Sequence, residues 1–176
     1  MLTPPAPLRI TLLCSLVALF FGGIAMAKAK AWLFPYKGYA KVKAYTFNLA
    51  EDGKQKHICG APFDGDGEPC PTLSEGVLMT SAQVEELLAA VNSRKTYGAP
   101  LSKCFIPHHG FVFYDKDEKL VAQISVCFMC DQLRGSPEVK AAPKRPMKAA
   151  LSQGGEARLK AVCKDIGLKA CDKSRP

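Results

Sequence analysis

The first clear pattern of apolar and polar positions lies at residues 42–47, where the side chains alternate with a period of two. Val42, Ala44 and Thr46 interleave with Lys43, Tyr45 and Phe47. A period of two among β-forming residues predicts a strand. The Glu-Asp-Gly-Lys run at 51–54 predicts a turn, because Asp-Gly favours positive φ, and residues 55–59 are expected to return as a second strand.

Two further β-rich runs flank the charged residues 115–119 and predict a hairpin with a polar tip. Their apolar positions are Phe111, Phe113, Val121, Ile124 and Val126. A turn centred near Asp117 sets the register, with a slip of one or two residues allowed. The cross-strand pairs are then Phe111 with Gln123, His109 with Ser125, and Cys104 roughly with Cys130. In each of these registers, three cysteines and two histidines meet at one end of the ribbon.

Helical spacing of apolar residues occurs in two places. The run 80–94 can begin with Thr80 or Ser81 as its N-cap and ends before Gly98. Its apolar face consists of Val84, Leu87, Leu88 and Val91. Residues 156–171 predict a shorter helix that stops at Gly167. Its inward residues are Leu159, Val162 and Cys163.

Together these elements predict an α+β fold, in which a small antiparallel sheet is covered by one main helix and a short C-terminal helix. A chain of 176 residues suits a single core. We expect this core at 28–135, a flexible Pro/Lys/Ala-rich segment at 136–155, and a C-terminal helix and tail at 156–176 that pack on the core. The run 59–71, rich in Gly, Pro and Asp, is expected to be a loop.

Composition and charge change this picture little. The chain is 48% hydrophobic and carries a net charge of +8 at pH 7, which is compatible with a globular protein. Its lysines are scattered or lie in the Pro/Ala-rich segment, and no stripe of arginines alternates with aromatic residues. Binding of nucleic acid is therefore not expected.

The N-terminus has the pattern of a secretory signal peptide over residues 1–27. An apolar run ends at Ala25-Met26-Ala27, which fits a cleavage site, so the mature chain is expected to begin at Lys28. The alternatives are an uncleaved anchor, since about 20 apolar residues span a bilayer, and lipid attachment at Cys14. We expect a periplasmic or secreted protein that contacts a membrane only if this N-terminal segment stays uncleaved.

The number of cysteines adds a constraint. Removal of Cys14 leaves seven of the eight cysteines, so at least one must be free, metal-bound or paired between chains. Exported chains that are rich in cysteine usually contain disulfides. Cys59 and Cys70 would close the loop at 59–71, and Cys163 and Cys171 would attach the last helix to the tail.

Three interpretations compete for the end of the hairpin. The preferred one is a disulfide between Cys104 and either Cys127 or Cys130, since neighbouring strands bring Cα atoms about 5.5 Å apart. The second is a zinc or copper site that uses soft and imidazole ligands. Its candidate ligands are Cys104, His108, His109, Cys127 and Cys130. The third is thiol-redox chemistry at the CxxC motif of residues 127–130, although no helix follows to lower a thiol pKa.

Other catalytic and metal-binding motifs are missing from the sequence. It contains no nucleophile elbow, phosphate loop, zinc-protease motif or dinucleotide fingerprint. Asp64, Asp66 and Glu68 alternate as in a calcium loop, but Pro69 stands where an EF-hand needs glycine, so a solvated turn is preferred. A non-catalytic role is favoured, and the question of enzymatic activity stays open.

A longer motif carries a resemblance. The pattern C-F-x-P-H-H-G-F-V-F-Y-D followed by V-C-F-x-C resembles a group of uncharacterised bacterial exported or lipoprotein-type proteins. The matching positions are Cys104, Pro107, His109, Cys127, Phe128 and Cys130, within residues 104–133. The preceding helix and the Ile-Gly-Leu run at 166–168 add weaker support. The resemblance implies a bacterial envelope protein and brings no activity.

We therefore expect an exported envelope protein with a non-catalytic binding or structural role, whose partner is a protein or another envelope component. The alternative is a metal-binding or thiol-redox protein that uses Cys104, His109, Cys127 and Cys130. No cofactor is required by the first interpretation, whereas the second needs zinc or copper if a metal is bound.

Overall fold

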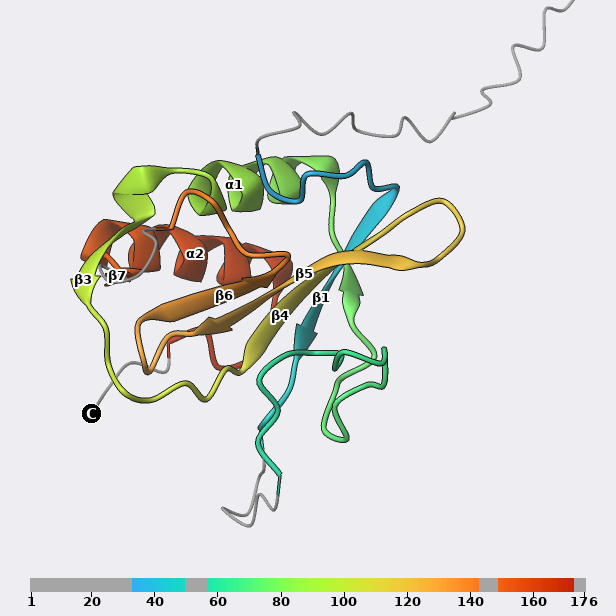
Figure 1. Cartoon of the computed structure of the whole chain (residues 1–176), viewed down its shortest axis with the longest axis horizontal. Helices are drawn as coiled ribbons and strands as arrows, with labels where there is room; N and C mark the ends of the chain where they lie inside the picture. Colours follow the sequence, from blue (N-terminus) through green and yellow to red (C-terminus); the bar gives the residue numbers. More distant parts are fainter. Residues whose placement is uncertain (1–32, 50–56, 143–148, 173–176) are drawn as a thin grey trace, which may run out of the picture.

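The computed structural model describes residues 33–49, 57–142 and 149–172, and it confirms the α+β class (Figure 1). The elements are β1 (Lys41–Thr46), β2 (Val77–Leu78), α1 (Ser81–Val91), the 3-10 turn η1 (Arg94–Thr96), β3 (Tyr97–Pro100), β4 (His109–Tyr114), β5 (Leu120–Cys127), β6 (Gln132–Ser136), β7 (Ala149–Leu151) and α2 (Gln153–Ile166). Five strands form an antiparallel sheet in the order β2-β1-β4-β5-β6, and β3 pairs with β7 in a second, two-stranded sheet.

The predicted signal peptide at 1–27 and the predicted turn at 51–54 lie outside the described residues. Neither helix in the part of the chain that the structure describes has the length and apolar character needed to cross a membrane.

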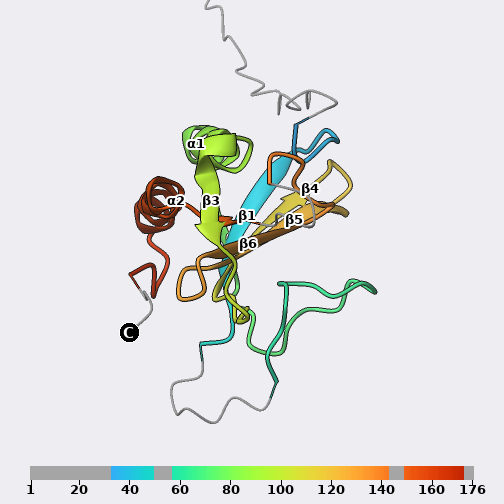
Figure 2. The ribbon, with the colours of Figure 1, turned by 60° about the vertical axis from the view of Figure 1, so that its left-hand side comes forward.

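Both helices cover one face of the five-stranded sheet, and the loop at 57–76 lies on the other side (Figure 2). Alternate residues of β1, β4 and β5 point toward the helices because side chains alternate along a strand. The buried core on that face includes Val42, Ala44, Phe111, Phe113 and Ile124 from the sheet, and Leu87, Val91, Leu159 and Val162 from the helices. This cluster is the main hydrophobic core of the fold.

The hairpin of β4 and β5 forms where predicted, but its register is shifted by one residue. Phe111 pairs with Ile124 rather than with Gln123. A bulge beyond Phe113 causes the shift, because it places one extra residue, Val121, on β5. The shift lies within the slip of one or two residues that the sequence allows. A change of one residue in register nevertheless places each side chain of the strand on the other face of the sheet. Gln123 consequently points away from the helices, toward the loop at 57–76.

The main helix is shorter than predicted. A capping box between Thr80 and Gln83 begins α1 as expected. The helix ends at Val91 because the Asn92 side chain turns back, where its amide nitrogen donates to the carbonyl oxygens of Leu88 and Phe34. The expected continuation to residue 94 is therefore wrong, and residues 94–96 form the 3-10 turn η1 instead.

One other expectation about the chain path needs correction. Residues 57–59 form no strand, and β1 is flanked instead by β2 and β4. Within the predicted flexible segment at 136–155, the described residues include Val139, which is buried in the core, strand β7, which pairs with β3, and the start of α2 at Gln153. These contacts come from sequence positions that lack a recognisable strand or helix pattern.

The first turn of α2 packs directly on the backbone of η1. The Ser152 hydroxyl caps the helix by accepting the Gly155 N–H, and the Ser152 N–H donates to the Thr96 carbonyl oxygen. A Cβ atom placed on Gly155 would lie 2.3 Å from that same oxygen, whereas one placed on Gly154 would meet open space. Glycine at 155 therefore allows the close approach of α2 to η1.

We expect Gly155→Ala to lower the free energy of unfolding by about 1–3 kcal/mol, because the added methyl group must displace backbone atoms. Gly154→Ala is the matched control. It should leave the free energy of unfolding unchanged or raise it by about 0.5–1 kcal/mol, since alanine restricts the unfolded chain. Urea denaturation of the two variants checks this, and equal stability of both would contradict the packing described.

Candidate functional site

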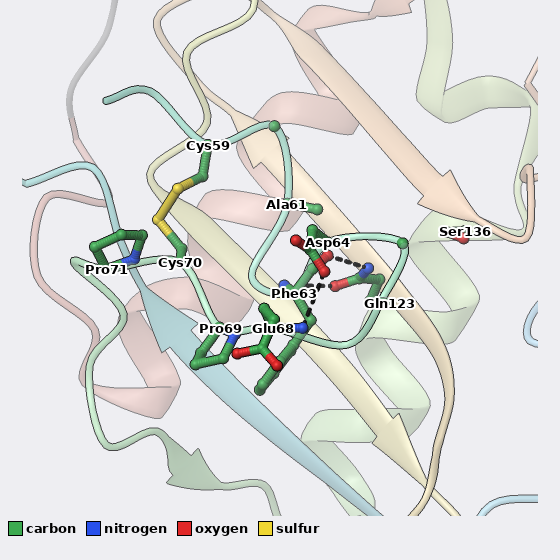
Figure 3. A pocket seen from close by; sticks show the side chains of 12 residues that line it. Cys59, Ala61, Phe63, Asp64, Glu68, Pro69, Cys70, Pro71, Gln123 and Ser136 are labelled. Carbon is green, nitrogen blue, oxygen red and sulfur yellow. Dashed lines mark hydrogen bonds between the residues drawn. A yellow bond between two sulfur atoms is a disulfide. The ribbon is translucent and has the colours of Figure 1, made fainter. Parts of the chain in front are cut away.

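A cleft of about 460 Å³ lies between the loop at 57–76 and the sheet (Figure 3). Loop residues form most of its wall, and two residues of the sheet complete it. The lining residues are Cys59, Gly60, Ala61, Phe63, Asp64, Gly65, Glu68, Pro69, Cys70, Pro71, Gln123 and Ser136. The cleft lies on the face opposite the helices.

Gln123 fixes the loop to the sheet through its side-chain amide. Its Nε2 atom donates to the Phe63 carbonyl oxygen at 2.8 Å, and its Oε1 atom accepts the Phe63 N–H at 3.1 Å. The buried amide thus gives the Phe63 N–H and carbonyl groups the hydrogen-bond partners that a neighbouring strand would otherwise provide. Gly110 lets the loop approach closely, because a Cβ atom there would lie 2.1 Å from the Pro62 ring.

Asn48 fixes the two ends of the loop from the end of β1. Its side chain donates to the carbonyl oxygens of Cys59 and Pro107, both at 2.8 Å, and accepts the Cys59 N–H at 3.1 Å. Its backbone N–H donates to the Thr72 hydroxyl. The Cys59–Cys70 disulfide closes the same loop, as the sequence predicts, with 6.0 Å between the Cα atoms. Both ends of the cleft wall are thus fixed.

The acidic residues of the loop form a hydrogen-bonded turn. One carboxylate oxygen of Asp64 accepts the N–H groups of Asp66 and Glu68, both at 2.9 Å. Within the described ranges, these three acidic residues do not bring their oxygens together as a ligand group. The two hydrogen bonds to Asp64 form the turn that the sequence predicts. Asp64 and Glu68 nevertheless place two carboxylates on the rim of the cleft.

At the end of the hairpin, Cys104 is bonded to Cys130, with 5.8 Å between their Cα atoms. Cys130 is one of the two partners that the sequence leaves open for Cys104. The Gln132 side chain holds the same corner by donating to the Ser102 and Cys104 carbonyl oxygens at 2.8 and 2.7 Å. The bond and these contacts attach residues 102–104 to the start of β6.

Cys127 is the free cysteine among the described residues, and it is fully buried. Burial raises the pKa of its thiol, because a thiolate would lose the hydration of water. Backbone N–H groups of Ile106, Cys130 and Met129 lower the pKa without reversing that direction. The thiol is therefore neutral at physiological pH, unlike an activated redox cysteine.

The five candidate metal ligands are not brought together as one set. Among the described residues, the group whose ligand atoms all lie within 4.8 Å of one another is His109, Cys163 and Cys171. His109 points to the helix side of the sheet, where its Nε2 atom bonds the Lys169 carbonyl oxygen at 2.8 Å. Cys163 and Cys171 form the expected disulfide. No sequence pattern indicates that the C-terminal tail returns to His109.

Comparison of the chain with protein-family models, with curated proteins and with solved structures gave no match. The three disulfides indicate that the protein folds in an oxidising, extracytoplasmic environment, because reducing compartments keep cysteine thiols reduced.

We expect Gln123→Met to release the loop. The Phe63 N–H and carbonyl groups lose their hydrogen-bond partner, whereas methionine keeps the side-chain volume of glutamine. The free energy of unfolding should fall by about 1–2 kcal/mol. Amide hydrogen exchange at Phe63 should become faster. Gln132→Met is the matched control, since it removes a buried amide from the neighbouring strand and should leave exchange at Phe63 unchanged. Unaltered protection of Phe63 in Gln123→Met would contradict the role of this amide.

We expect Cys127 to resist iodoacetamide at pH 8 in the native protein and to be labelled in urea. The raised pKa keeps the folded thiol neutral to a higher pH than an exposed thiol, and burial excludes the reagent. Native labelling should therefore rise only above the ordinary thiol pKa. Mass spectrometry of the labelled peptides checks this, and rapid native labelling at pH 8 would contradict it.

Proposed function

We propose that the protein is an exported bacterial envelope protein, periplasmic or secreted, with a non-catalytic binding role, and that the cleft beside the Cys59–Cys70 loop is its binding site. Three disulfides support an extracytoplasmic location. The signal-peptide pattern at residues 1–27 and the resemblance of residues 104–133 to exported bacterial proteins support the envelope of a bacterium.

The observation that carries this proposal is a cleft whose walls are fixed in advance. Its volume of about 460 Å³ falls within the range of ligand pockets in proteins. One disulfide, the Gln123 amide and the Asn48 side chain hold the loop that forms its wall. A loop that is already ordered loses little conformational entropy when a ligand binds, which favours affinity.

The cleft also indicates the chemistry of the ligand. Two carboxylates, from Asp64 and Glu68, lie on its rim although the whole chain carries a net charge of +8. Phe63, Pro69 and Pro71 supply apolar surface beside them. A peptide or small molecule that joins a cationic group to a short apolar stem is complementary to this arrangement.

The polar groups that line the cleft are already engaged in holding the loop, which favours binding over catalysis. Gln123 and Asp64 already hold backbone groups of the loop, and both cysteines of the cleft are joined in a disulfide. At the end of the hairpin, the Cys104–Cys130 bond and the burial of Cys127 weigh against the thiol-redox alternative.

The experiment is an amide NMR titration with trilysine as the probe. We expect shifts confined to residues 59–71, Gln123 and Ser136, since these line the cleft. Gly65→Phe should weaken or abolish them, because it adds a bulky side chain to a residue that lines the cleft and has room for it. Gly154→Phe adds the same group at an open position on α2 and should bind as the wild type does. An unchanged spectrum, or shifts elsewhere on the surface, would count against the proposal.

A further inference from the structure

Three soft or imidazole ligands converge on the helix side of the sheet, away from the cleft. His109 begins β4, Cys163 lies on α2, and Cys171 follows that helix. Their exposed fractions are 1%, 0% and 4%, and one ligand atom from each lies within 4.8 Å of the other two. In the oxidised protein the two sulfur atoms are bonded to each other, so they cannot act as thiolate ligands.

Two hydrogen bonds position these ligands in addition to the disulfide. The His109 Nε2 atom donates its hydrogen to the Lys169 carbonyl oxygen, because a carbonyl can only accept. This hydrogen bond fixes the orientation of the imidazole ring, which is the role that such bonds have in metal sites. The turn after α2 is held by the Leu168 N–H, which donates to the Cys163 carbonyl oxygen at 3.2 Å.

We propose that reduction of the Cys163–Cys171 disulfide converts this group into a buried Cu(I) site, with His109, Cys163 and Cys171 as its three ligands. The buried bond becomes accessible when the tail after α2 opens, and two molecules of a small thiol then supply the two electrons and two protons that break it. They leave as one disulfide, and the protein gains two thiols. Cu(I) then binds and displaces the two thiol protons to solvent.

The donor set and its burial favour this ion. Two thiolates and one imidazole are soft ligands, which select Cu(I) or zinc over hard cations. Structural zinc sites almost always have four ligands, whereas the structure brings together three, at positions that are closed to water. Coordination would link β4 to α2 and the tail, so the ion would replace the disulfide as a crosslink of the C-terminal region.

The chain contains three histidines, so the imidazole nitrogen spectrum separates the proposed ligand from the others. The protein is reduced with dithiothreitol, desalted without oxygen, and mixed with equimolar Cu(I). We expect the His109 nitrogen signals to shift while those of His57 and His108 stay unchanged. The oxidised protein should show no shift. A bound ion that leaves the His109 signals unmoved, or an equal shift in the oxidised protein, would overturn the proposal.

Two double variants test which cysteines supply the thiolate ligands. Cys163→Ser combined with Cys171→Ser should abolish the His109 shift, whereas Cys59→Ser combined with Cys70→Ser should retain it. His109→Gln should weaken Cu(I) binding at least about tenfold in competition with bathocuproine disulfonate. If the reduced chain unfolds, Cu(I) should restore its dispersed amide spectrum. Failure to restore it, or equal affinity of the His109→Gln variant, would overturn the proposal.

Discussion

The fold depends on burying the second face of its five-stranded sheet beneath a loop rather than beneath another layer of helices. A loop brings unpaired backbone N–H and carbonyl groups against the sheet, and each needs a partner when water is excluded. Gln123 on β5 and Asn48 after β1 provide those partners from within the sheet. Because both side chains extend from the sheet region, the loop takes its position from rigid elements, and the cleft beside it has fixed walls.

The local elements were largely predictable because each is encoded by neighbouring residues. The alternation in β1, the hairpin of β4 and β5, the Thr80 cap and the Gly167 stop all follow from short patterns. The parts that were missed depend on tertiary contacts. β2 contains two residues, β7 contains three, and the end of α1 is decided by a side chain that bonds Phe34, far away in sequence. Such contacts leave no periodic signal.

For the candidate site, the disulfide pairs could be predicted from the sequence better than the directions of the side chains. The pairs Cys59–Cys70 and Cys163–Cys171 followed from spacing, and the meeting of Cys104 with Cys130 followed from the hairpin. The cleft was not predicted, because it requires Gln123 to face the loop, and a single bulge residue decides that orientation. The bulge does not affect His109, whose face of the strand meets the C-terminal tail, a contact that leaves no pattern in the sequence.

The order of the cysteines has a consequence for biosynthesis. Two of the disulfides join cysteines that follow one another along the chain, whereas Cys104–Cys130 passes over Cys127. If the chain is exported from its N-terminus, as proposed above, Cys127 reaches the oxidising compartment before Cys130 and is the first partner that Cys104 meets. An oxidase that joins cysteines in order of arrival would form the non-native bond, and thiol–disulfide exchange must then move it. Maturation of this protein is therefore expected to require an isomerase in addition to an oxidase.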